Sequence, residues 1–183
     1  MLFLDRNPSI KTPVVDETEQ GQTDSAPSVK TAWGLDIGTA SIVSCTQDDE
    51  GQMLEQEQNA FFVVPGNPRT RDILDKQGMR YLQKDDAIFI LGNLAERSAD
   101  IFKQNTKRPM RKGLLNPGEP DGVEAIMEMV TAMIPADQRG GTPVCFSVPG
   151  DPVGQEGAVV YHEAMLKMHL KALGFLPKSI NEG

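Results

Sequence analysis

The second half of the sequence alternates helical and strand-like segments, and this alternation restricts the chain to few folds. Apolar residues recur at helical spacing over residues 123–134, which predicts a helix. Residues 143–149 are mostly apolar and bounded by prolines, as expected of a strand buried on both faces. A second helix is expected over residues 155–173, with Gly174 beyond its end, followed by a last strand over residues 175–181. Strands separated by helices are typical of a parallel sheet, so the sequence predicts an α/β fold.

The first half predicts an antiparallel meander instead. Trp33–Ile37 and residues 41–45 form two strand-like runs around a tight turn, and a third strand extends from Gln52 to Val64. A small inserted subdomain follows at about residues 66–116. Within it, residues 87–92 are predicted to form the second arm of a hairpin, with a short helix near residues 94–102.

Composition excludes several classes of protein. A formal net charge of −8 opposes binding to phosphate backbones, so no nucleic-acid partner is expected. The longest apolar runs are far shorter than the roughly 20 residues of a membrane-spanning helix, and the start of the chain lacks a secretion-signal pattern. We therefore expect a cytoplasmic protein with no membrane span. Residues 1–31 are polar and lack sustained periodicity, which predicts a disordered leader.

The turn at residues 36–40, called the 36–40 turn below, is the main candidate for chemistry. It places the Asp36 carboxylate at the end of a strand, followed by Gly38 and Thr39. Gly38 allows the backbone to turn tightly, so that neighbouring amides can point at a phosphate. Asp36 could then hold a hydrated magnesium ion beside that phosphate. The alternative is a plain hairpin in which Asp36 only stabilises the turn. Neither GxxxxGK[ST] nor GxGxxG is present.

The cysteines and histidines favour structural interpretations. Cys45 and Cys145 lie in apolar runs without a CxxC motif or a nearby histidine, and we expect buried free thiols. His162 and His169 share a helix face but lie about 10 Å apart along its axis. That separation is too large for a joint metal site, so surface or partly packed histidines are predicted.

A basic stretch without an intervening acid lies in the inserted segment. The stretch is interpreted as a solvated loop, and the alternative is a contact with a partner or a phosphate. The stretch consists of Lys103, Lys107, Arg108, Arg111 and Lys112.

Several segments together resemble a known superfamily. GLDIGTASIV, residues 34–43, resembles the first phosphate loop of the actin, heat-shock chaperone and sugar kinase superfamily. KRPMRKGLL, residues 107–115, resembles the segment that closes the small insertion in bacterial rod-shape (MreB-like) actin homologues. VCFSVPG at residues 144–150 resembles their next core strand. SINEG at residues 179–183 resembles the strand-to-helix junction of the family, although Gly183 stands where the chaperones have proline.

The resemblance implies a fold and a set of site residues. The fold is a ribonuclease H-like lobe of an actin-like ATPase, with a five-stranded mixed sheet in the order 3-2-1-4-5 and flanking helices. ATP or ADP with magnesium would be the cofactors. Asp36 would organise magnesium through water, Gly38, Thr39 and Ala40 would contact the phosphates, and Glu182 would orient the hydrolytic water.

The resemblance covers about residues 32–183 and implies an amino-terminal lobe only. The second phosphate loop and the adenine pocket belong to a second lobe, and Val43 stands where actins have a lysine. The implied parent is a nucleotide-dependent, filament-forming cytoskeletal ATPase. Its partners would be nucleotide and either further copies or the missing lobe. The alternatives are a non-catalytic scaffold of the pilus or division type and a fragment of an ATP-dependent chaperone.

Overall fold

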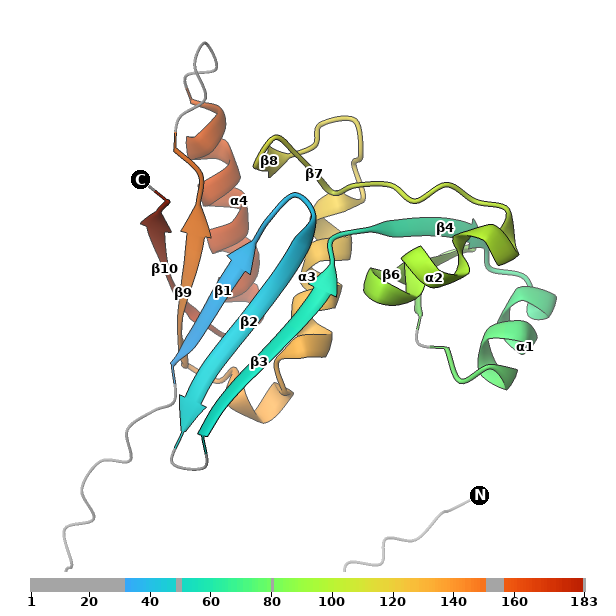
Figure 1. Cartoon of the computed structure of the whole chain (residues 1–183), viewed down its shortest axis with the longest axis horizontal. Coiled ribbons are helices and arrows are strands. Elements are labelled where there is room, and N and C mark those ends of the chain that lie inside the picture. The colour runs from blue at the N-terminus through green and yellow to red at the C-terminus, as the bar shows by residue number, and fades with distance from the viewer. Residues whose placement is uncertain (1–31, 49–50, 80, 151–156, 183) are drawn as a thin grey trace, which may run out of the picture.

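The computed structural model describes residues 32–48, 51–79, 81–150 and 157–182. A five-stranded sheet with helices on one face forms the main body, and a smaller sheet lies beside it (Figure 1). The strands of the main sheet are β1 (Trp33–Ile37), β2 (Ser41–Asp48), β3 (Gly51–Gln58), β9 (Pro143–Val148) and β10 (Leu176–Asn181). The molecule is therefore an α/β protein, as predicted.

The order of the main sheet is β10-β9-β1-β2-β3. β1 pairs antiparallel with β2 and parallel with β9, and β9 pairs parallel with β10. Counted along the chain within this sheet, the order is 3-2-1-4-5, so the predicted order is confirmed. The strand Trp33–Ile37 lies at the centre, and its carboxyl end lies at the same edge as those of β9 and β10.

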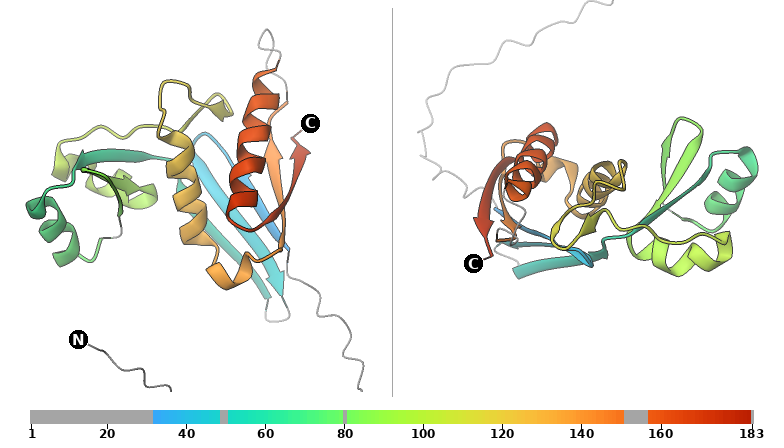
Figure 2. Two further views of the ribbon diagram at one scale, coloured as in Figure 1. Left: turned by 180° about the vertical axis from the view of Figure 1, so that it is seen from behind. Right: turned by 90° about the horizontal axis from the view of Figure 1, so that it is seen from above.

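Helices α3 (Gly122–Met133) and α4 (Ala158–Ala172) pack on one face of this sheet (Figure 2). They share the main core with alternate residues of β1 and β9, such as Leu35 and Phe146. No helix among the described residues covers the opposite face. The prediction that the β9 strand is buried on both faces is wrong, because Cys145 and Ser147 point to that uncovered face and are only half-buried.

The inserted subdomain has its own sheet in the order β4-β6-β5. Its elements are β4 (Phe61–Pro65), α1 (Pro68–Lys76), β5 (Leu82–Lys84), β6 (Ala87–Leu91) and α2 (Gly92–Phe102). The β5–β6 hairpin and helix α2 were predicted, whereas α1 was not. The proposed single strand from Gln52 to Val64 is wrong, because it divides at the buried residues Asn59 and Ala60 between the two sheets.

The two faces of the inserted sheet are both covered. Phe62 and Ile90 pack with Leu74 of α1 and Ala95 of α2. On the other face, Phe61 and Phe89 stack with ring centroids 6.2 Å apart and pack against Ala125 of α3. The insertion is thus attached to the main body through a small apolar contact with α3. The Lys84–Glu124 ion pair lies in the same region.

A short hairpin returns the chain from the insertion to α3. It consists of β7 (Met110–Arg111) and β8 (Leu114–Leu115). Lys112 and Gly113 form its turn with φ of 55° and 79°, as a two-residue type I′ turn requires. A single 3₁₀ turn, η1 (Ala136–Gln138), follows α3.

Two predictions fall on parts of the chain that the structure leaves out. The leader at residues 1–31 and the first two residues of the helix predicted over residues 155–173 lie outside the described residues. In the part of the chain that is described, no helix is long and apolar enough to cross a membrane.

Candidate functional site

The 36–40 turn connects β1 and β2 at the carboxyl edge of the main sheet. Gly38 closes it by donating its amide to the carbonyl of Ser41 at 2.9 Å. A Cβ at position 38 would lie 3.1 Å from that oxygen, so a side chain there would crowd the turn. Within the described residues, no acceptor is recorded for the amides of Thr39 and Ala40. The turn therefore presents two backbone donors that a ligand could use.

Three contacts fix the shape of this turn. Asn59, which is fully buried, donates its side-chain amide to the Gly38 carbonyl at 2.7 Å and its backbone amide to the Ala40 carbonyl at 2.9 Å. Gly113 of the β7–β8 turn donates its amide to Thr39 Oγ1 at 2.9 Å. The Thr39 hydroxyl thus anchors the neighbouring hairpin.

Sequence reasoning missed Asn59 as a site residue. It was assigned to the middle of a continuous strand, and its buried position between two sheets arises only in the folded chain. Gly113 belongs to the KRPMRKGLL segment, so the sequence contained a signal for that contact. Arg108 of the same segment forms an ion pair with Glu96 at 2.6 Å and approaches the Asn59 carbonyl at 3.4 Å.

Asp36 lies on the uncovered face of the sheet, next to the turn. Its Oδ1 accepts a hydrogen bond from Ser147 Oγ of β9 at 2.7 Å, and the Asp36 residue is exposed. The described residues contain no group of three or more side chains that could hold a metal ion. An exposed carboxylate with a hydroxyl beside it fits a magnesium ion that keeps most of its water ligands. Asp36 could hold such an ion only as part of a site completed by water and phosphate.

Glu182 follows β10 at the same edge of the sheet. Its amide donates to the Val148 carbonyl at 3.0 Å, which extends the β9–β10 pairing by one residue. Strand β9 therefore separates Glu182 from the strand that carries Asp36. Glu182 is exposed, and the convergence of its carboxylate with that of Asp36 near Gly38 stays a prediction.

His162 is more deeply buried than expected, with 1% of its surface exposed. Its Nδ1 accepts the Leu115 amide at 3.3 Å, and its Nε2 is buried without a hydrogen-bond partner in the described residues. Burial lowers the pKa of this imidazole below 6.5, while the charges of Glu163 and Glu182 act in the opposite direction. The side chain is therefore neutral near pH 7. The prediction of a surface or partly packed histidine is wrong at this position.

The two cysteines flank the same glycine. In the register of the sheet, Gly34 of β1 lies opposite Cys45 of β2 on one side and opposite Cys145 of β9 on the other. Both thiols are free and half-buried, because they point to the uncovered face of the sheet. The expectation of buried thiols is wrong in that respect.

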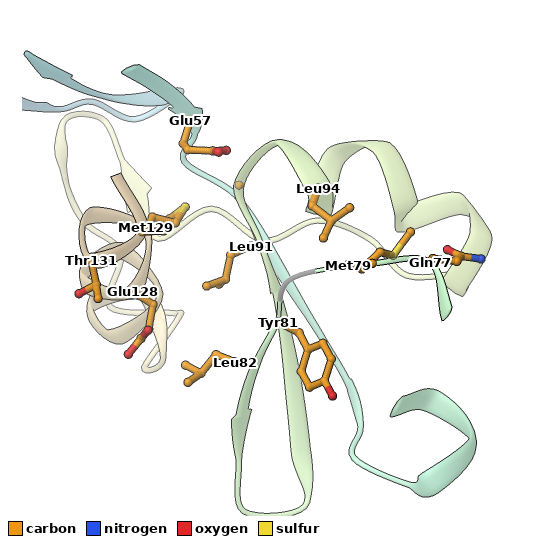
Figure 3. A pocket seen from close by; sticks show the side chains of 13 residues that line it. Glu57, Gln77, Met79, Tyr81, Leu82, Leu91, Leu94, Glu128, Met129 and Thr131 are labelled. Carbon is orange, nitrogen blue, oxygen red and sulfur yellow. The ribbon is translucent and has the colours of Figure 1, made fainter. Parts of the chain in front are cut away.

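Two cavities lie away from the 36–40 turn. The first, of about 580 Å³, separates the inserted sheet from α3. Figure 3 shows Leu82, Leu91 and Met129 turned toward its interior. The second, of about 860 Å³, lies between the β7–β8 hairpin, the loop that follows it and the start of α4, and His162 lines it. Residues 38–40 line neither of these cavities.

These features define an α/β protein in which a rigid turn with free amides, an exposed aspartate and a glutamate share one edge of a mixed sheet. Residues 31–183 match the Volactin family, and the chain belongs to that family. No curated protein matches the chain. Among solved structures, the MreB 5 protein of Spiroplasma citri bound to AMPPNP has 15% sequence identity and a TM-score of 0.45. The match covers 85% of this chain and 39% of that one, so the chain spans well under half of its length.

Proposed function

We propose that this chain is the amino-terminal lobe of an actin-like nucleotide-binding protein, and that the 36–40 turn binds the phosphates of ATP or ADP. The free amides of Thr39 and Ala40 carry the proposal. They lie in a turn already fixed by Asn59 and Gly113, so a phosphate would bind without reorganising the backbone. Repulsion by the net negative charge is offset locally by such directed donors.

The roles of the remaining residues rest on the sequence resemblance. Asp36 would hold magnesium through water beside the phosphate, and Glu182 would orient the water that attacks it. Magnesium would supply charge neutralisation on the phosphate oxygens when bound. Positioning and charge stabilisation account for most of the catalysis in phosphoryl transfer. The adenine pocket and the opposing phosphate loop would come from a second lobe, and the complete protein would couple the nucleotide cycle to filament assembly.

A titration of the isotope-labelled chain with magnesium and ATP tests this proposal. The largest amide shifts are expected at Thr39 and Ala40, with a dissociation constant of about 1 mM or weaker, because one turn supplies only a few contacts. Asp36→Ala should remove the dependence of these shifts on magnesium. Asp137→Ala changes charge equally at an exposed position in η1 and serves as the matched control. Shifts confined to other residues would contradict the proposed site.

The same titration, read beside a phosphate-release assay, tests the claim that this lobe forms only half of a site. Hydrolysis by the chain alone should be no faster than by the Asp36→Ala variant. Tight binding of ATP, with hydrolysis that depends on Asp36, would show that the chain binds and hydrolyses ATP without a second lobe.

One observation favours a second function, that of a non-catalytic scaffold with the same fold. The polar side chains of the turn already have internal partners, since Asp36 bonds Ser147 and Thr39 bonds Gly113. In a scaffold these bonds would serve only to hold the turn. Loss of stability in Asp36→Ala without any nucleotide-dependent shift in the wild-type chain would support this alternative.

A further inference from the structure

The lining of the second cavity includes two basic side chains and one acid. The basic residues are Arg111 and Lys112 from the β7–β8 hairpin, and neither has an ion-pair partner among the described residues. The acid is Glu119, but its carboxylate is bound to Lys107 at 2.9 Å. Among the described residues, this leaves two cations without an ion-pair partner at one hollow, in a chain with a net charge of −8. The basic stretch identified in the sequence is thus divided, since Lys107 and Arg108 are used in ion pairs.

His162 also lines this cavity, and its neutral imidazole has one ring nitrogen without a partner in the described structure. Because Nδ1 accepts the Leu115 amide, the proton of the neutral imidazole must be on Nε2. That N–H group is buried and has no acceptor in the described structure. A buried unpaired donor is costly, at about 1–3 kcal/mol, so an acceptor in the cavity would relieve an existing deficit. His162 is one of only two histidines in the chain, which makes it a convenient reporter.

The first turn of α4 lies at the same hollow. Ala158, the first residue of this 15-residue helix, lines the cavity, and Gly157 before it has no side chain that could cap the helix. The amides at a helix start favour an anion through their unpaired N–H groups and the helix dipole. The two cations come from the β7–β8 hairpin, whereas the helix start and the imidazole N–H both come from the first turns of α4, and all three features favour the same type of ligand.

We propose that this cavity binds a phosphate-type oxyanion, held by Arg111, Lys112 and the Nε2–H group of His162. The site is separate from the 36–40 turn. The β7–β8 turn lies between the 36–40 turn and the cavity. Its Gly113 amide donates to Thr39, whereas Arg111 and Lys112 line the cavity. The anion could be free phosphate or the phosphoryl group of a larger molecule, because both present the same acceptor oxygens.

The imidazole resonances of His162 and His169 provide a direct test with inorganic phosphate as the probe. At constant ionic strength, phosphate in place of chloride should shift the His162 signals saturably. It should also raise the pKa of His162, since a nearby anion favours the charged imidazole. The charges of Glu163 and Glu182 already act on this group and should be unchanged throughout. His169 lies two turns further along α4, so its signals should stay constant and confirm that the chain remains folded.

Two charge-neutralising variants locate the anion. Lys112→Gln and Arg111→Gln should each weaken the phosphate effect on His162 about tenfold, as expected for loss of a charge-assisted hydrogen bond. Lys178→Gln removes the same charge from an exposed position on β10 outside the cavity and should change it little. Equal weakening by Lys178→Gln would mean nonspecific charge screening, and an unshifted His162 would mean no binding here. Either result overturns the proposal.

The Asp36→Ala variant separates this site from the 36–40 turn. The phosphate effect on His162 should be the same in Asp36→Ala and in the wild-type chain, whether or not the turn binds nucleotide. If Asp36→Ala abolishes the shift, the anion binds at the turn and the second site does not exist. The same measurement with ATP, in the absence of magnesium, compares the two possible sources of the anion. A stronger shift with ATP than with phosphate identifies the phosphoryl group of a larger molecule as the ligand, and an equal or weaker shift identifies the free anion.

Discussion

The two sheets of this molecule differ in how many of their faces are covered. The inserted sheet β4-β6-β5 has α1 and α2 on one face and α3 on the other, so most of its side chains serve packing. The main sheet is covered by helices on one face only (Figure 2). Its other face carries Asp36, Ser147 and both cysteines. The difference suggests a division of roles, in which the smaller sheet stabilises and the larger one provides the polar groups of the candidate site. Four substitutions test that division.

Phe146→Ala should have the largest effect. Phe146 is fully buried in the main core, and truncation of such a ring costs about 3–5 kcal/mol. If the main sheet is the framework on which the insertion depends, the free energy of unfolding should fall for both regions. Urea denaturation with hydrogen exchange measured at β1 and β6 amides provides the readout. Loss of protection in the main sheet alone would show that the insertion folds independently.

Leu74→Ala is the matched change in the insertion. Leu74 is also fully buried, and its truncation should cost about 2–5 kcal/mol. The cost should be local, because α1 contacts the insertion core and not the main core. We expect faster exchange of β4 and β6 amides with little change at β1. An equal loss at β1 would contradict the division into two regions.

The difference between the sheets also explains which features the sequence could predict. The helical spacing before Ile134 and the apolar run around Phe146 are local signals, and they identified α3 and β9. The order of the main sheet came from the resemblance to a known superfamily, not from a local pattern. The division of the third strand at Asn59 depends on which sheet each half joins, and no local pattern records that choice. Helix α1 was missed because its signal is short, consisting of the Asn67 cap and Pro68 in the first turn.

The candidate site was predictable to a similar degree. Asp36 and Gly38 lie within one short motif, so their neighbourhood followed from the sequence. The contacts of Asn59 and Ser147 join residues that are far apart along the chain, and they required the fold. The burial of His162 was missed because its side chain is polar, although it lies on the buried face of α4 with Val159, Leu166 and Leu170.

Asn59→Ala should have an intermediate effect at the junction of the two regions. It leaves the Gly38 carbonyl without its donor, at a cost of about 1–3 kcal/mol. If the junction positions the turn, the amide signals of Thr39 and Ala40 should move or broaden and the response to magnesium and ATP should weaken. Asn93→Ala removes a half-buried asparagine at the start of α2, which bonds β3 but not the turn, and is the control. Unchanged turn signals in Asn59→Ala would exclude a positioning role.

Lys84→Gln should have the smallest effect. It removes the ion pair with Glu124 that joins the tip of the inserted hairpin to α3, and both side chains are substantially exposed. Such pairs contribute at most about 1 kcal/mol, and less at high salt. The change in the urea midpoint should therefore be slight and should vanish in 1 M salt. A large, salt-resistant loss would mean that the insertion is held mainly by this pair and not by the contact of Phe61 and Phe89 with Ala125.

The absence of a side chain at Gly34 affects how this protein responds to thiol reagents. A Cβ at that position would lie 2.7 Å from the Cys45 sulfur, so the thiol occupies space that a side chain at position 34 would fill. With one strand between them, the α-carbons of Cys45 and Cys145 are about 10 Å apart, whereas a disulfide requires less than about 7 Å. Oxidation therefore cannot form a disulfide between Cys45 and Cys145 within the sheet. The rate at which thiol-specific labels modify the two cysteines instead measures how accessible the uncovered face is, and that rate would fall when another surface packs on it.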